Sequence, residues 1–397
     1  MWKLAFKNLL RDKRRTLLTF GILTVAITYY IVITGMLGGF EKESIRNFIA
    51  LQSSHMVIRS EDFNEETLEG YIETPSEIEN KLEKYPFIKA YTERLKIVGF
   101  LDNGIDQYPV VIVGIDPERD KAVFKTFEYA DAPLRDGIWI GSSIKKHFDV
   151  KEGDYLFLNM RGKNGIIVSR EVEIKSILNT PDFEINNSHI YIDINLLRDM
   201  GNFKDEVTQI NILTDEFNKA ESYKNRLISA FKKFKITSWV DEGADFLAIS
   251  KTKNAAQAVL LFFIILIGII GTANTLLISV FEKTREIGTL KAIGMTDREV
   301  MKLFLSEGVL IGVAGSLSGV IIGILINWYF VVHGIDWSPL LKDMDVGYKV
   351  MGIVKNTWNI KSIIVALFLG PLTTIFASYF PSKRAMKMTP AECLRWV

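Results

Sequence analysis

The stretch FEKTREIGTLKAIGMTDREV, residues 281–300, is dense in charges of both signs and separates two of the most hydrophobic segments of the chain. Residues 254–281 before it and residues 308–335 after it contain no Lys, Arg, Asp or Glu. A helix needs roughly 20 apolar residues to cross about 30 Å of hydrocarbon. The alternation therefore predicts two membrane-spanning helices joined by a short charged segment.

Two further uncharged runs, residues 17–40 and 362–382, are also long enough to cross a bilayer. Lipid leaves backbone groups no outside partner, so only helices and closed barrels span it, and these runs are too long for barrel strands. We expect an integral membrane protein with four transmembrane helices at residues 17–40, 254–281, 303–332 and 362–382. The net charge of the 397-residue chain is +1, which argues against nucleic-acid binding.

Basic residues near the span ends predict the orientation, because cytoplasmic loops are enriched in Lys and Arg. Residues 1–16 form a basic amphipathic pattern, typical of a helix at the cytoplasmic membrane surface. We expect the loop 282–302 and the tail 383–397 on the same side. Residues 41–253 and the loop 333–361 are then extracytoplasmic.

The 41–253 segment has the pattern of a large α+β domain inserted between the first and second spans. Seven short runs rich in Ile, Val, Tyr and Phe predict strands: residues 95–100, 108–115, 137–141, 154–160, 166–178, 189–194 and 209–214. Residues 74–85 and 215–234 have helical patterns, and Asn164-Gly165 predicts a hairpin turn. The sole cysteine, Cys393, lies in the predicted tail, so this domain has no disulfide.

Catalytic and metal motifs are missing from the sequence. The four histidines are scattered, there is no cysteine pair, and there is no HExxH or G-x-x-x-x-G-K-[ST] motif. We therefore predict no catalytic residue, no metal site and no bound cofactor in this chain, and we do not expect it to be an enzyme.

The charged segment has its own internal order. Ile287, Leu290, Ile293 and Gly294 fall on one side of a short helix, and Gly294 is a plausible end for it. Thr296 and Glu299 have the spacing of a capping box that starts the next helix. An apolar ridge on a charged helix favours a docking surface over an ordinary loop.

The third span carries glycines at regular spacing: Gly308, Gly312, Gly315, Gly319 and Gly323. Small residues four apart let a second helix approach closely, so we expect a packing face. Glu307 lies near the start of this span, and we expect it to pair with Lys302 and Arg298 at the interface.

Five segments of the sequence carry a likeness to a known family: IGIIGTANTLLISVFEKTREIGTLKAIGMTDREV (267–300), AFKNLLRDKRRTLLT (5–19), GIWIGSSIKKHFDVKEGDYLFL (137–158), SEGVLIGVAGSLSGVIIG (306–323) and YFPSKRAMKMTPAECLRW (379–396). In these segments the sequence resembles the FtsX-like/MacB-type family of ABC transporter permeases. These segments occur in the family's order. The chain is most similar to the LolC/LolE lipoprotein-releasing permeases.

The resemblance implies a dimer with a second permease, identical or homologous, bound to an ABC ATPase dimer that holds the ATP and Mg. The coupling helix would lie at about residues 284–295. Its implied contact residues are Glu282, Arg285, Glu286, Ile287, Leu290, Lys291, Ile293 and Gly294. The implied mechanism is mechanotransmission, in which ATP-driven closure moves the helices and the outer domains.

For LolC/LolE-type members the resemblance also implies a lipoprotein substrate and an acyl cavity between the outer ends of the first two spans. The corresponding residues are Ile33, Met36, Leu37, Phe40, Val259, Phe262, Phe263 and Leu266; ordinary lipid-facing or core packing explains each of them equally well. LolC-type domains carry a long hairpin hook for a periplasmic chaperone, whereas NMRGKNGII (159–167) is only a short turn.

We therefore expect an inner-membrane permease that releases lipoproteins from the outer leaflet. Two alternatives remain open: an efflux permease for peptides or toxic small molecules, and a signalling permease that controls an extracytoplasmic hydrolase.

Overall fold

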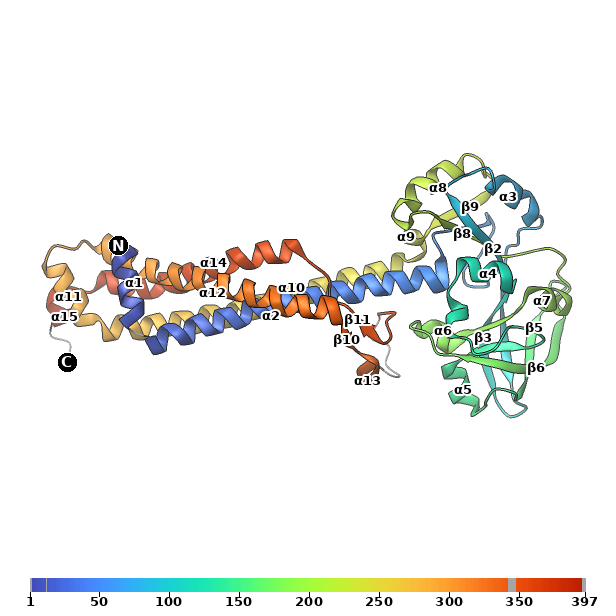
Figure 1. The fold of residues 1–397 in the computed structure, drawn as a ribbon, viewed down its shortest axis with the longest axis horizontal. Coiled ribbons are helices and arrows are strands. Elements are labelled where there is room, and N and C mark those ends of the chain that lie inside the picture. Colours follow the sequence, from blue (N-terminus) through green and yellow to red (C-terminus); the bar gives the residue numbers. More distant parts are fainter. Residues whose placement is uncertain (1, 12, 342–347, 395–397) are drawn as a thin grey trace. The chain divides into compact units, whose positions relative to one another are not determined.

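The computed structural model describes residues 2–11, 13–341 and 348–394. Parts of the predicted surface helix (1 and 12), outer loop (342–347) and tail (395–397) lie outside the described residues. The chain forms two compact units (Figure 1). The helical unit holds Met1–Glu41, Lys251–Trp337 and Gly352–Val397, and the sheet unit holds Lys42–Ser250 and Ser338–Met351.

Four long helices contain the predicted spans: α2 (Lys13–Phe48), α10 (Ala244–Glu282), α12 (Asp297–His333) and α14 (Ile360–Lys387). The helical segments long and apolar enough to cross a membrane are Thr16–Ser53, which runs from α2 through the following turn Ile49–Ser53, and Leu261–Glu282, Asp297–His333 and Ile360–Lys387. Both α2 and α10 extend into the predicted 41–253 domain, because hydropathy marks only the apolar part of a helix and the polar and charged residues next to it also favour helix.

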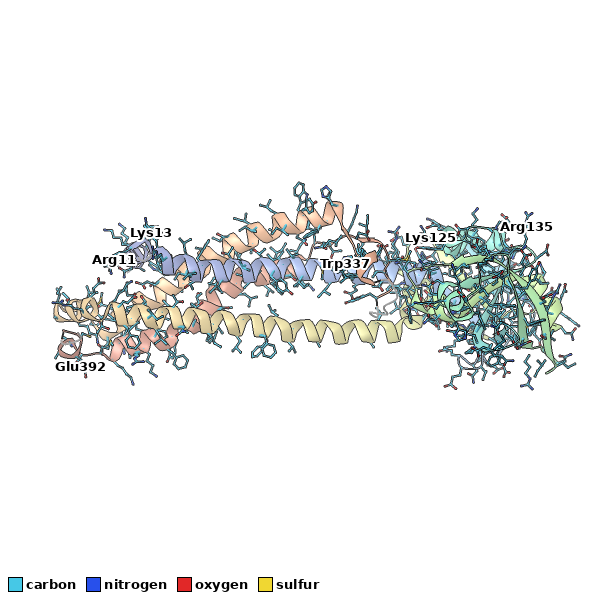
Figure 2. All side chains as sticks on the ribbon, turned by 90° about the horizontal axis from the view of Figure 1, so that it is seen from below. Arg11, Lys13, Lys125, Arg135, Trp337 and Glu392 are labelled. Carbon is cyan, nitrogen blue, oxygen red and sulfur yellow. The ribbon has the colours of Figure 1, made fainter. Side chains whose placement is uncertain are left out.

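Short elements complete the helical unit. They are α1 (Trp2–Arg11), α11 (Thr284–Ala292), α15 (Pro390–Leu394) and the antiparallel pair β10 (Ile335–Asp336) and β11 (Ile353–Val354). In α1 the buried residue is Ala5, whereas Trp2, Phe6 and Leu10 are exposed. Arg11 and Lys13 lie where α1 gives way to α2 (Figure 2).

A nine-stranded mixed sheet forms the centre of the sheet unit, in the order β3-β7-β4-β6-β5-β2-β8-β1-β9. The strands are β1 (Met56–Ser60), β2 (Ile88–Asp102), β3 (Gln107–Ile115), β4 (Ile138–Gly141), β5 (Tyr155–Arg161), β6 (Ile167–Leu178), β7 (His189–Asp193), β8 (Gln209–Thr214) and β9 (Phe234–Ser238). Because β3 also pairs with β2, the strands from β3 to β2 close into a ring, and β8, β1 and β9 extend from it.

The sheet unit also contains helices and short turns. They are α3 (Pro75–Leu82), α4 (Pro117–Val123), α5 (Ser142–Phe148), α6 (Phe183–Ser188), α7 (Ile194–Gly201), α8 (Ala220–Ile228), α9 (Trp239–Glu242) and α13 (Ser338–Leu341), with η1 (Ile49–Ser53), η2 (Thr126–Tyr129) and η3 (Phe217–Lys219). The α+β prediction is thus confirmed. Its main apolar core joins inward side chains of the strands, such as Ile58, Leu95 and Ile210, to α3, α7 and α8.

All seven predicted strands are present, and Arg161 pairs with Ile167 across the predicted hairpin, whose Gly165 has φ +80°. Two strands of the nine-stranded sheet were missed, as was the short pair β10 and β11. MVIRS in β1 begins three residues after the end of η1, and FKITS in β9 has too few apolar residues for a strand signal. The single helix predicted over 215–234 is wrong, because α8 ends at Ile228 and Phe234 begins β9.

One residue of the 338–351 segment is held tightly within the sheet unit. The Lys349 backbone donates to Ser44 Oγ at 2.6 Å and accepts from Asn47 Nδ2 at 2.8 Å. Its ammonium lies 2.7 Å from Asp182 Oδ2 and 3.2 Å from Gln52 Oε1. This segment therefore packs with the sheet unit, although the chain on both sides of it belongs to the helical unit.

Candidate functional site

The short helix expected at about residues 284–295 is present as α11, a separate helix between α10 and α12. Lys283 is the one residue between α10 and α11. At the other end Gly294 has φ +107°; its N–H donates to Lys291 O, and Met295 N–H donates to Leu290 O, both at 3.0 Å. These two bonds form a Schellman motif, which fixes the end of α11.

A capping interaction begins α12. The Thr296 N–H and hydroxyl donate to the Glu299 carboxylate at 2.9 Å and 2.8 Å. The predictions that Gly294 ends the first helix and that Thr296 and Glu299 start the second are confirmed. Both ends of α11 are therefore set by local sequence.

One side of α11 is buried within the chain itself. Ile287 is only 3% exposed and packs with Ala385 and Cys393. A Cβ on Gly288 would lie 2.5 Å from the Cβ of Cys393, so only glycine lets α15 come this close. Burial raises the pKa of the Cys393 thiol. The expectation that Ile287 belongs to an exposed apolar ridge is wrong, since the tail covers it.

Lys291 also points into the chain. Its ammonium donates to the backbone oxygens of Met386 and Met388 at 2.6 Å and 2.7 Å, and pairs with Asp297 at 2.7 Å. Carbonyls at a helix C-terminus attract a cation, and α14 ends here. Lys291 was expected to contact a partner, but its side chain holds α11 against the end of α14.

The exposed side of α11 carries most of the remaining predicted contact residues. Ile293 is 79% exposed. Glu282, Arg285, Glu286 and Gly294 are exposed, and Leu290 is half-buried. The Glu286 carboxylate accepts two bonds from Arg11 of α1, at 2.7 Å and 2.8 Å. An exposed charged surface with Ile293 as its large apolar side chain is thus available to a partner.

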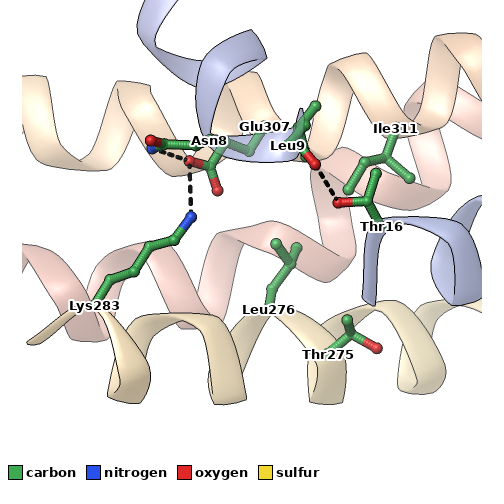
Figure 3. A pocket seen from close by; sticks show the side chains of 8 residues that line it. All are labelled: Asn8, Leu9, Thr16, Thr275, Leu276, Lys283, Glu307 and Ile311. Carbon is green, nitrogen blue, oxygen red and sulfur yellow. Dashed lines mark hydrogen bonds and ion pairs between the residues drawn. The ribbon is translucent and has the colours of Figure 1, made fainter. Parts of the chain in front are cut away.

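Glu307 lines a small cavity between α1, α2, α10 and α12 (Figure 3). It is 1% exposed, its Oε1 accepts from Asn8 Nδ2 at 2.6 Å, and Lys283 Nζ lies 3.7 Å from the same oxygen. The pairing predicted with Lys302 and Arg298 is wrong. Glu307 instead faces α1 and Lys283, because it follows Lys302 by five residues and Arg298 by nine, which places it on a different side of α12 at 3.6 residues per turn.

The five glycines of α12 face two helices. A Cβ on Gly308 or Gly312 would lie 1.9 Å or 2.2 Å from the hydroxyl oxygens of Ser378 and Thr374 on α14. On the next turns of α12, a Cβ on Gly315, Gly319 or Gly323 would lie about 3 Å from atoms of α2. This stripe of glycines therefore lets α12 pack closely against α14 and α2.

The residues expected to line an acyl cavity divide into two sets. Val259, Phe262, Phe263 and Leu266 lie on one face of α10, and each is 38–60% exposed. On α2, Ile33, Met36 and Leu37 are half-buried. Phe40 is buried, with its ring 5.1 Å from that of Trp337, which is labelled in Figure 2. Phe40 therefore packs inside the chain rather than lining a surface.

The sequence analysis missed Asn8, Lys283 and Gly288. Each of them contacts a residue that is distant in the sequence, so no local sequence pattern predicts its role. Among the described residues, no cluster of His, Cys, Asp or Glu could hold a metal ion. The helical unit therefore presents two surfaces: the exposed side of α11, whose ends are fixed by hydrogen bonds, and the exposed apolar face of α10.

Comparison with known proteins agrees with this arrangement. Residues 258–390 match the family described as FtsX-like permease C-terminal. The chain is 20% identical over 392 residues to the lipoprotein-releasing system transmembrane protein LolE of Haemophilus influenzae, covering 94% of this chain and 93% of that protein. It is 22% identical over 433 residues to LolC of Neisseria meningitidis serogroup B, covering 98% and 97%.

A third relative matches a shorter region. The macrolide export ATP-binding/permease protein MacB of Chlorobium luteolum is 35% identical over 126 residues, which is 32% of this chain and 16% of MacB. With four long apolar helices, a sheet unit between the first two in the sequence and a family match at 258–390, the chain contains an FtsX-like permease domain and is similar to LolE and LolC along most of its length and to MacB over a third of it.

Proposed function

We propose that this chain is a permease subunit of a lipoprotein-releasing ABC transporter of the inner membrane. The observation that carries the proposal is the similarity to LolE and LolC over more than nine-tenths of both chains, whereas MacB matches only a third of this chain. N- and C-termini in the cytoplasm and the sheet unit outside the membrane follow from the distribution of Lys and Arg.

The partner that drives the cycle is an ABC ATPase dimer, which binds the ATP and Mg. It docks on the exposed side of α11, where Ile293 supplies an apolar contact and Arg285 and Glu282 supply charge. Closure of the ATPase moves α11, and because Lys283 alone separates α11 from α10, the motion passes directly into the second span. This transmission of movement replaces passage of a substrate through the membrane.

The cargo contacts the exposed face of α10. Val259, Phe262, Phe263 and Leu266 offer aromatic and branched side chains to acyl chains, with Ile33, Met36 and Leu37 of α2 as candidates for the facing surface. An identical or homologous second permease completes the cavity. The flexible thioether of Met36 suits chains of varied shape.

Depletion of the chain followed by membrane fractionation tests the cargo. Lipoproteins destined for the outer membrane should accumulate in the inner membrane, and expression of the wild-type chain should restore their distribution. Normal distribution after depletion would contradict lipoprotein release. Sensitivity to exported toxic compounds, or loss of an extracytoplasmic hydrolase activity, would then point to efflux or to signalling.

A further inference from the structure

We propose that Glu307 is a positioning residue that fixes the joint between α10 and the coupling helix α11, and so determines how much of the ATPase movement reaches the spans. The inference rests on the proposed function for its cargo readout. Its structural basis is the meeting of three elements on one buried carboxylate: α1 through Asn8, the α10–α11 joint through Lys283, and α12, which carries Glu307 (Figure 3).

Burial gives this contact its strength. Glu307 is 1% exposed and Lys283 is 5% exposed, so neither charge is screened as a surface pair would be. Losing one partner of a buried ion pair removes an attraction that solvent does not replace, whereas exposed pairs contribute little. The joint should therefore open more often when either member is neutralised.

The position of Lys283 explains why this contact can control coupling. Lys283 is the residue at which α10 ends and α11 begins, with φ −93° and ψ 9°. Two backbone hydrogen bonds hold Lys283 in place: Lys283 N donates to Ser279 O at 3.1 Å, and Ile287 N donates to Lys283 O at 2.9 Å. Holding the Lys283 side chain to α12 thus restrains the direction in which α11 leaves α10.

Glu286, one helical turn after Lys283, provides a matched control. Glu286 pairs with Arg11 at 2.7 Å, but both side chains are about half exposed. The same Glu-to-Gln change at 286 removes a charge from the coupling helix without disturbing a buried pair. The two carboxylates therefore separate an effect of the buried joint from a general effect of charge.

The experiment compares the full-length wild type with Glu307→Gln, Lys283→Met, the double variant and Glu286→Gln. Hydrogen exchange of the 284–292 amides, without ATPase, should be about tenfold faster in each single buried variant and less than twofold faster in Glu286→Gln. Exchange in the sheet unit should not change. In reconstituted complexes, lipoprotein released per ATP should fall at least about fivefold in the single buried variants, and the double variant should recover part of both losses.

Unchanged exchange in α11, or an equal rise throughout the chain, would overturn the inference. The inference would also be overturned if the double variant showed no slower exchange and no greater release per ATP than the worse of the two single variants. A wild-type complex that hydrolyses ATP but releases no lipoprotein would instead contradict the proposed function, and the exchange rates alone would then decide whether Glu307 holds the joint.

Discussion

The ammonium of Lys349 lies 2.7 Å from the Asp182 carboxylate, and Asp182 is completely buried. Burial raises the pKa of Asp182, while the neighbouring charge of Lys349 opposes the rise. Asp182 also accepts from Glu184 N at 3.0 Å, which starts α6. The ion pair between Lys349 and Asp182 thus attaches the residues around Lys349 to the start of α6.

Replacing Lys349 with Met should therefore destabilise this part of the sheet unit. Removing one partner of a buried ion pair costs about 3–5 kcal/mol, because the remaining charge has no compensation. Native-state hydrogen exchange of the 183–188 amides measures the local free energy of opening. Lys355→Met, at an exposed position, is the control and should change that energy by less than about 0.5 kcal/mol. Equal effects of the two changes would contradict the role of the pair.

Acid should destabilise the sheet unit through two buried histidines. Burial is the main cause that lowers the pKa of His55 and of His189 from 6.5 to about 4. Between these values the unfolded chain binds protons that the folded chain excludes. Stability should therefore fall as the pH drops from 6.5 towards 4, by about 1.4 kcal/mol per pH unit for each histidine.

The His55→Gln variant tests this pH dependence. Chemical unfolding of the full chain at pH 6.5 and pH 5 gives the loss of stability for the parent and for the variant. The loss should be about 2 kcal/mol smaller in the variant, because one titrating imidazole is gone. His55 Nδ1 accepts from Thr214 N at 3.1 Å, so the variant should start from a lower stability. The same loss in both proteins would exclude His55 as a source.

The glycine stripe of α12 should not tolerate added atoms where backbone lies opposite. A Cβ on Gly312 would come within 2.8 Å of Gly370 O and 2.9 Å of Pro371 Cα. Gly312→Ala should cost about 1–3 kcal/mol through overpacking. A Cβ on Gly21 of α2 would meet nothing within 4 Å, so Gly21→Ala should be neutral or stabilising. Thermal unfolding in detergent compares them, and equal midpoints would contradict close packing at Gly312.

Two isoleucines, Ile287 buried within α11 and Ile293 exposed at its C-cap, should behave differently. Ile293→Ala should weaken ATPase association by about tenfold, as expected for an apolar contact near the centre of an interface, and leave stability unchanged. Ile287→Ala should cost about 2–5 kcal/mol of stability, because it leaves a cavity against the tail. Titration of the ATPase onto each variant, with thermal unfolding beside it, separates the two effects. Unweakened association of Ile293→Ala would remove this surface as the docking site.

The sequence was sufficient where the determining interactions are local. Uncharged runs predicted the four spans, alternating apolar residues predicted seven strands, and Gly294 and Thr296 predicted the ends of two helices. In each case the residues that form the element are also those that carry its signal. The capping residues and the glycine spacing act within a few positions of themselves.

Long-range partners could not be predicted in this way. Asn8 and Glu307 are 299 residues apart, and neither has a local pattern that names the other. Ile287 has the spacing of an exposed ridge, but its burial depends on where Cys393 and the tail fold. Likewise, Phe40 was expected at a cavity, but the tertiary contact with Trp337 buries it.

The most direct measurement of the central claim is ATP-dependent release of an acylated lipoprotein from proteoliposomes that contain this chain and its ABC ATPase. Release should require ATP hydrolysis, and it should fall when Phe262 and Phe263 on the exposed face of α10 are replaced by charged residues. ATP hydrolysis by a stable complex that leaves every lipoprotein in the vesicles would contradict the account.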